Sequence, residues 1–193
     1  MAIIYKLVLR PYYKKILGQF GQKSFLPFST KLEFAKNIFI GNQVSIGRMS
    51  WLASNPLTNN RNPILTIGDG TYIGNFAHIY CTSKIEIGKN VLFADKVYVS
   101  DNLHTFEDVN VCIINQSIKQ LDTINIGDGA WIGENVCIIG ASIGKQSVVG
   151  ANSVVNKSIP DYCVAVGSPA KIIKRYSFEK KAWLKTNSGG DFV

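Results

Sequence analysis

Two histidines are the only side chains of this 193-residue chain that titrate near neutral pH without perturbation. His104 is flanked by Asp101 and Glu107, so a carboxylate could orient its ring and leave the other nitrogen free to exchange a proton. Glu107, Asp101 and a backbone carbonyl are the three options for that orienting partner. His78 and Asn102 are further candidates, as contacts to a substrate, although His78 is more simply read as an ordinary side chain on a strand.

The elements that must position these residues follow a six-residue repeat. Aliphatic residues recur at this interval, often with a glycine directly after them, and the clearest run is Ile126, Ile132, Ile138, then Ile143, Val149 and Val155. A period of six fits neither a helix nor a two-faced strand, whose side chains repeat at about 3.6 and 2 residues. It is typical of a parallel β-helix, in which each unit is one short strand plus a corner and three units close one coil. We therefore predict an all-β solenoid.

The repeat divides the chain into three parts. Residues 1–35 lack it and are predicted to form a helical capping segment; residues 36–166 are predicted to form the β-helix domain. Residues 167–193 are predicted to form a turn, a short helix and a tail. Within the domain the pattern breaks at residues 54–63 and 101–123, and the second break carries His104. Insertions that leave the frame of a repeat protein commonly hold its functional residues.

The N-terminal segment has the spacing of a helix with two stripes. One stripe is apolar and one is basic, and their members are Ile3, Ile4, Leu7 and Val8, then Lys6, Arg10 and Lys14. Pro11 should kink or restart this helix. The favoured interpretation is a helix that covers the first coil; the alternative is a helix that lies on an anionic membrane surface.

Composition limits the partners. The net charge is +8, which suits a phosphorylated ligand or an anionic surface. Nucleic acid is excluded as a partner because the basic residues are dispersed and no nucleic-acid-binding motif is present. The four cysteines show neither paired nor zinc-ligand spacing, which predicts a reduced, cytoplasmic setting and no metal.

Several motifs together resemble the hexapeptide-repeat acyltransferases, and most of all the sugar O-acetyltransferases of the maltose and galactoside type. The resemblance rests on the repeat, on the loop around His104, and on the runs 129–133, 148–155 and 167–171. It implies a left-handed parallel β-helix and a homotrimer. It also implies transfer of an acetyl group from acetyl-CoA to a sugar hydroxyl, in the synthesis of a surface polysaccharide or glycan.

The resemblance also implies roles for individual residues. His104 falls where the family has its general base, and Trp131 where an aromatic lies beside the acyl group, reaching His104 across a subunit interface. The backbone N–H of Glu134 falls where the oxyanion is bound. The groove for coenzyme A is implied at Ala151, Asn156, Lys157, Lys171 and Lys174. At residue 134 the family more often has a small polar side chain, and at residues 171 and 174 it often has arginine.

Three other functions compete with this one. N-acetylation of an amino sugar would use the same fold and cofactor. A metal-dependent hydratase on this fold needs three histidine ligands per metal ion, and the chain has two histidines. A non-catalytic scaffold would trimerise without binding coenzyme A.

Overall fold

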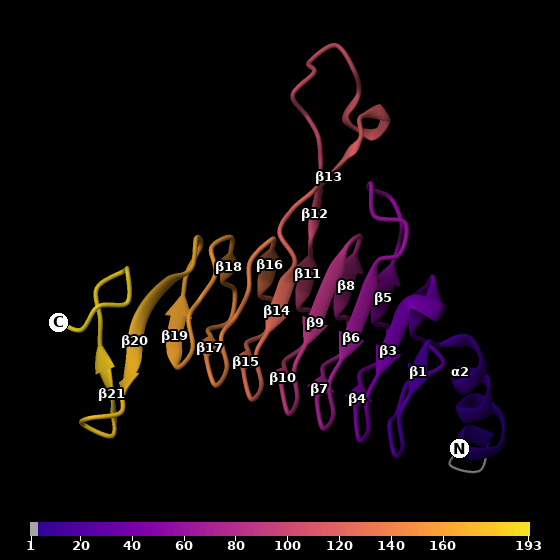
Figure 1. Ribbon diagram of the computed structural model, residues 1–193, viewed down its shortest axis with the longest axis horizontal. Coiled ribbons are helices and arrows are strands. Elements are labelled where there is room, and N and C mark those ends of the chain that lie inside the picture. Colours follow the sequence, from indigo (N-terminus) through magenta and orange to yellow (C-terminus); the bar gives the residue numbers. More distant parts are fainter. Residues whose placement is uncertain (1–3) are drawn as a thin grey trace.

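Three parallel sheets wind along one axis in the computed structural model, which describes residues 4–193 (Figure 1). Sheet A contains β1 (Gln19–Phe20), β3 (Ile38–Ile40), β6 (Ile64–Ile67), β9 (Lys84–Ile87) and β14 (Ile124–Ile126). Sheet B contains β4 (Ser45–Ile46), β7 (Tyr72–Ile73), β10 (Leu92–Phe93), β15 (Trp131–Ile132), β17 (Val148–Val149), β19 (Cys163–Val166), β20 (Lys171–Ser177) and β21 (Ala182–Lys185). Sheet C contains β2 (Lys31–Glu33), β5 (Trp51–Ser54), β8 (His78–Cys81), β11 (Tyr98–Ser100), β16 (Cys137–Ile139) and β18 (Val154–Val155).

From β3 to β11 the strands visit sheets A, B and C in turn, and each pairs in parallel with the strand one coil away. The six-residue period arises because one aliphatic residue per strand points inward. Ile126, Ile132 and Ile138 represent the three sheets, and each is fully buried. The small residue that follows is needed for close approach, since a Cβ at Gly127 would collide with the backbone nitrogen of Lys145. The predicted all-β class and its parallel coils are confirmed.

One corner is a residue shorter than the repeat demands. Ile138 and Ile143 are five residues apart, and the turn between them contains Gly140 at φ +56°. A side chain there would press on Leu121, with a Cβ–Cβ distance of 2.8 Å. Ile143 still bridges in parallel to its neighbours in the coils before and after, so the corner absorbs the missing residue without shifting the strands.

The N-terminal helix covers the first coil. It comprises the π-helical η1 (Tyr5–Leu9) and the α-helical α2 (Arg10–Ile16), with Pro11 in the first turn of α2. Tyr13 and Leu17 are buried in the core, and Tyr5 and Leu9 pack against it. Ile4, Leu7 and Val8 of the predicted apolar stripe are instead exposed, and Ile3 lies outside the described residues. The sheets begin earlier than residue 36, because β1 and β2 already pair with β3 and β5.

The predicted C-terminal helix is wrong. Residues 171–185 form the antiparallel hairpin β20–β21, which adds two strands to sheet B beside β19. Lys181 adopts φ +50° in the turn, and Trp183 packs edge-on to Tyr176 at 5.6 Å between ring centroids. Without this hairpin, the last coil would expose the unpaired backbone edge of β19. The backbone hydrogen bonds gained by pairing that edge stabilise a strand here more than the local side-chain spacing stabilises a helix.

The excursion at residues 101–123 leaves the coil at the corner between sheets C and A and projects from the body of the solenoid (Figure 1). Its base is the antiparallel pair β12 (Asn102–His104) and β13 (Ile118–Gln120), and its outer part contains the short 3₁₀ helix η3 (Ile113–Asn115). A second short 3₁₀ helix, η2 (Ala35–Asn37), precedes β3. Nowhere in residues 4–193 does a helix combine the length and the apolar character needed to span a bilayer.

Candidate active site

His104 is the last residue of β12 and lies opposite Ile118 of β13. Its side chain is exposed, so a substrate can approach the imidazole directly. Among the described residues, neither nitrogen of the ring has a hydrogen bond to Asp101 or Glu107. The chain therefore presents His104 on a short hairpin, and the identity of its orienting partner stays a prediction.

Asp101 is completely buried and anchors the base of that hairpin. One carboxylate oxygen accepts hydrogen bonds from the backbone N–H and the hydroxyl of Thr82 at 2.7 and 3.0 Å. The other accepts the backbone N–H groups of Ser83 and Lys84 at 2.8 and 3.1 Å. A buried carboxylate with this many donors holds the corner before β9 against the start of β12. Asp101 therefore supports His104 through the backbone that carries it.

Gln120 completes this anchor, a role that was not predicted from the sequence. Its side-chain amide donates to the carbonyl oxygen of Asp101 at 2.7 Å, and its amide oxygen accepts from the hydroxyls of Thr82 and Thr58 at 2.9 and 2.8 Å. Thr58 lies in the loop between β5 and β6, 62 residues away in sequence. The two breaks in the repeat thus meet in space at the foot of the hairpin.

Glu107 and Asn102, the other predicted residues of this loop, have different environments. Glu107 is fully exposed, and hydrogen bonds from the backbone N–H groups of Phe106 and of Glu107 itself lower the pKa of its carboxyl. Asn102 is nearly buried, and its amide donates to the carbonyl oxygen of Tyr80 at 3.3 Å and to Asp101 at 3.2 Å. Glu107 is thus free to meet a ligand, whereas the Asn102 amide group is already engaged.

His78 belongs to an aromatic cluster on the outer face of sheet C. Its ring stacks on Trp51 with 4.2 Å between centroids and 8° between planes, and the rings of Tyr80 and Tyr98 meet it edge-on. Burial lowers the pKa of the imidazole, and the nearby positive charge of Lys31 lowers it further. The structure thus favours a neutral, packed His78, and its predicted substrate contact remains untested.

This environment predicts a pH-dependent stability. Because the pKa of His78 is lower in the folded chain than its ordinary value of 6.5, the unfolded chain binds the proton more readily. The contribution of neutral His78 to the free energy of unfolding should therefore be fully present above pH 6.5, and it should be lost as the pH falls below that value. Thermal unfolding from about pH 8 to pH 5 should show a smaller loss of stability in His78→Phe than in wild type. Equal losses in both proteins would contradict this.

Trp131 lies on the outer face of sheet B and is half exposed. Strand pairing aligns it with Val148, Val148 with Val164, and Val164 with Lys174. Three strand spacings separate the indole from this lysine, which is about 14 Å. Lys171 lies on the same strand as Lys174, and both are exposed. An aromatic and two cations thus share one face of the solenoid.

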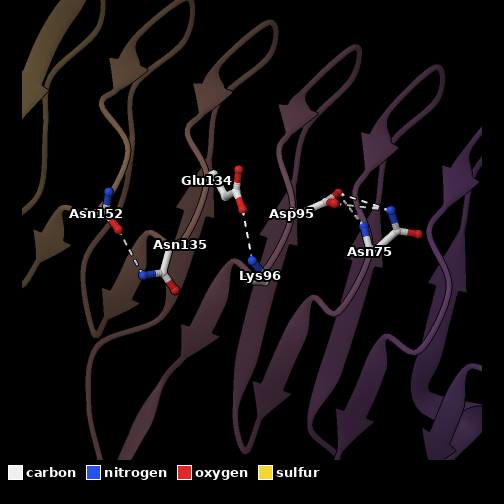
Figure 2. Close-up of polar contacts among 6 residues, drawn as sticks. All are labelled: Asn75, Asp95, Lys96, Glu134, Asn135 and Asn152. Carbon is white, nitrogen blue, oxygen red and sulfur yellow. Dashed lines mark hydrogen bonds and ion pairs between the residues drawn. The ribbon is translucent and has the colours of Figure 1, made fainter.

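The corner between sheets B and C carries a ladder of polar side chains that bridge successive coils (Figure 2). Asn75 accepts the backbone N–H of Arg48 at 2.9 Å, and Asp95 accepts the backbone N–H of Asn75 at 2.7 Å. One coil further on, the carboxylate of Glu134 turns aside to Lys96, at 3.1 Å. Two of these three side chains, Asn75 and Asp95, thus accept the N–H of the coil before them, whereas Glu134 does not.

The ladder ends at Ala151, which has no acceptor to offer the coil before it. Within residues 4–193, the backbone N–H of Glu134 donates no hydrogen bond, although its carbonyl oxygen accepts the N–H of Asn152 at 2.9 Å. Both residues are exposed. The N–H group that the family resemblance implies as an oxyanion donor is therefore open, because the alanine at the next corner of the ladder has no side-chain acceptor.

Asn156 and Lys157 lie near the hairpin. A cavity of about 430 Å³ is lined by Asn156 together with Leu103 of β12 and Gln120 of β13. Lys157 is the next residue and is exposed. These two predicted coenzyme contacts therefore share the corner between sheets C and A with His104, on a different edge of the coil from Glu134 and Ala151.

Apart from His78 on sheet C, the predicted site residues fall into two groups on one chain. One group gathers at the corner of sheets C and A, and contains Asp101, Asn102, His104, Glu107, Asn156 and Lys157. The other group lies on sheet B or at its corner with sheet C, and contains Trp131, Glu134, Ala151, Lys171 and Lys174. Figure 1 shows the hairpin projecting on the opposite side of the solenoid from β15. In the described residues, no group of three or more His, Cys, Asp or Glu side chains is arranged to hold a metal ion.

The cysteines give a simple test of the packing. Burial and the neighbouring charge of Asp101 raise the pKa of the Cys81 thiol to about 12, and burial raises that of Cys163 as well. Cys112, on the hairpin, is exposed. Because the thiolate is the reactive form, iodoacetamide at about pH 8 should label Cys112 quickly and spare Cys81 until the chain unfolds. Peptide mass spectrometry checks this, and rapid labelling of Cys81 would contradict the packing.

Comparison with known proteins agrees with this architecture, although no protein-family model matches the chain. An Escherichia coli protein named as a lipopolysaccharide biosynthesis O-acetyl transferase, WbbJ, is 37% identical over 129 residues, covering 63% of this chain and 66% of WbbJ. A Mycobacterium tuberculosis protein named as an acetyltransferase is 36% identical over 133 residues, covering 68% of this chain and 44% of the relative. The chain thus spans less than two thirds of the length of these curated relatives.

Among solved structures, a hexapeptide-repeat acetyltransferase from Vibrio cholerae in complex with acetyl coenzyme A is 28% identical, with a TM-score of 0.62. The superposition covers 87% of this chain and 76% of that one. The repeat, the coiled sheets and these similarities lead to one conclusion. The chain is similar in sequence and in fold to acetyltransferases of the hexapeptide-repeat type.

Proposed function

We propose that this protein transfers an acetyl group from acetyl-CoA to a hydroxyl group of a sugar, on a left-handed β-helix. The observation that carries the proposal is the exposed imidazole of His104 on a hairpin whose base is fixed by buried Asp101. Hydroxyl groups are poor nucleophiles at neutral pH, so a positioned base is the element that this reaction needs most.

The mechanism follows from the two groups of residues. His104 accepts the proton of the sugar hydroxyl while its oxygen attacks the thioester carbonyl. The negative charge that develops on the carbonyl oxygen is stabilised by the open N–H of Glu134. The tetrahedral intermediate then collapses, the carbon–sulfur bond breaks, and the protonated imidazole gives its proton to the departing thiolate. Trp131 supplies an apolar wall beside the acetyl group.

These groups meet only if two copies of the chain share a site, so we place the active site at the interface of a homotrimer. The hairpin of one subunit would reach over sheet B of its neighbour. The exposed ammonium groups of Lys157, Lys171 and Lys174 would then contact the phosphates of coenzyme A as point charges.

The acceptor is proposed to be a sugar of a surface polysaccharide or other glycan, and the setting to be the cytoplasm. The proposed acceptor rests on the name of the WbbJ relative, which specifies O-acetyl transfer in lipopolysaccharide biosynthesis. An amino-sugar acceptor, giving N-acetylation, is the alternative, because the same base and oxyanion donor would serve an amine.

The proposal is tested by thiol release from acetyl-CoA, measured over a panel of sugars, nucleotide sugars and their amino analogues. Thiol release that depends on a sugar with hydroxyl groups but no amino group supports O-acetylation. Thiol release with amino sugars alone would show that the reaction is N-acetylation instead. If coenzyme A does not bind in equilibrium titration, the acyltransferase proposal fails as a whole.

A further inference from the structure

The N-terminal helix has an apolar stripe that none of residues 4–193 covers. Ile4, Leu7, Val8 and Tyr12 recur at the spacing of one helix face, and their exposed fractions are 62, 72, 57 and 52%. The adjacent face, which includes Tyr13, is the one that packs on the first coil. A helix that is apolar on two sides buries one side in its own fold and offers the other to a partner.

The apolar stripe continues onto the neighbouring loop. A hollow of about 770 Å³ lies between the helix and that loop, with Ile4 and Lys6 on one side and Phe25, Phe28 and Arg48 among the residues on the other. Phe28 is 79% exposed. The surface is thus wider than the helix alone, and cations lie at its margin.

Charge identifies the partner. Residues 1–32 contain six lysines and arginines and no aspartate or glutamate, so they hold six of the eight net positive charges of the chain. Arg10 is engaged with the backbone, since it donates to the carbonyl oxygens of Gly21 and Ser24 at 2.8 and 3.1 Å. Lys6, Lys14 and Lys15 are exposed on the helix and free to meet an anionic surface.

We propose that this helix docks the protein on the surface of an anionic lipid bilayer, with Ile4, Leu7, Val8 and Tyr12 inserted among the headgroups and lysines at their flanks. An apolar stripe bordered by lysine is the composition that interfacial helices use on anionic membranes. A second copy of the chain is a poorer fit, because a symmetric contact would bring the same cations together.

The position of the helix suits this role. The helix covers the first coil, whose strand in sheet C is β2. The hairpin with His104 leaves the solenoid after β11, which lies three strand spacings from β2 in sheet C. That separation is about 14 Å along the axis, so docking leaves the hairpin clear of the headgroups. The inference does not depend on acetyl transfer, and the two can fail separately.

The experiment is flotation of the full chain with vesicles of phosphatidylcholine containing about 30 mol% phosphatidylglycerol, beside vesicles of phosphatidylcholine alone. Wild type should bind the anionic vesicles at least about tenfold more tightly and should be released by about 0.5 M salt. Leu7→Glu/Val8→Glu should bind at least about tenfold more weakly. Val109→Glu, at a residue 92% exposed on the distant hairpin, is the matched control and should bind like wild type.

Charge variants keep the test decisive if the double glutamate variant fails to fold. Lys6→Gln and Lys14→Gln, which leave the apolar stripe intact, should each weaken binding about fivefold. Equal binding of wild type to both kinds of vesicle, or unchanged binding of the Leu7→Glu/Val8→Glu variant, would overturn the proposal. The proposal would also be overturned if, without lipid, the double variant formed a smaller oligomer than wild type. The apolar stripe would then be a contact between copies of the chain. Thiol release with a soluble acceptor should be the same in wild type and the double variant.

Discussion

Replacing His104 with alanine is expected to lower kcat for acetyl transfer by about 10²–10⁴-fold, the usual contribution of a positioned general base. The side chain is exposed at the end of β12, so its removal leaves no cavity and should not alter the fold. Binding of coenzyme A should be retained, because the lysines assigned to the phosphates are unchanged. The check is thiol release at saturating acetyl-CoA, with equilibrium titration of coenzyme A in parallel.

The matched control is Thr105→Ala, at the half-buried residue directly after His104. The Thr105 hydroxyl donates to the carbonyl oxygen of Ser117 at 2.8 Å across the hairpin, so its loss tests whether loosening the hairpin alone explains the effect. A Thr105→Ala enzyme as slow as His104→Ala would shift the explanation from base catalysis to hairpin geometry. A His104→Ala enzyme within about threefold of wild type would remove His104 from the mechanism.

Replacing Ala151 with aspartate is expected to lower kcat by about 10²–10³-fold, the typical cost of losing one oxyanion donor. At the equivalent corner two coils earlier, Asp95 accepts the backbone N–H of Asn75 at 2.7 Å. A carboxylate introduced at position 151 would extend this ladder, accept the N–H of Glu134 and place a negative charge where the oxyanion must form. The thermal midpoint should not fall, because aspartate is native to this corner.

Ala151→Gly provides the control, since it changes the same position without adding an acceptor. It should retain most of the wild-type kcat. If Ala151→Asp binds coenzyme A and keeps kcat within about threefold of wild type, the N–H of Glu134 is not the oxyanion donor.

The sequence predicted the parts of this fold that depend on local spacing. The period of six specified which residues point inward, because each short strand contributes one buried aliphatic residue such as Ile132. The short corner before Ile143 was also visible, as an interval of five. The C-terminal helix was mispredicted because the spacing around Trp183 carries no information about the free edge of β19 that β20 covers.

The site could be predicted residue by residue but not as an arrangement. His104 was recognisable from its place in a break of the repeat. The anchor of the hairpin was not, since Gln120 and Thr58 are 62 residues apart and neither is distinctive in type. The role of Ala151 depends on an acceptor that it lacks, which becomes visible only when the corners are stacked in space. The exposed stripe of the N-terminal helix likewise required the structure, because both of its apolar faces have helical spacing.

The measurement that tests the central claim most directly is acetyl transfer by mixed trimers of His104→Ala and Ala151→Asp. Each variant alone should be nearly inactive. If every site takes His104 from one subunit and the open N–H of Glu134 from its neighbour, random co-assembly in equal amounts should restore about a quarter of the wild-type activity. If the mixture remains as inactive as the two variants separately, the site is not shared between subunits in this way, and the account of catalysis given by the two groups of residues is contradicted.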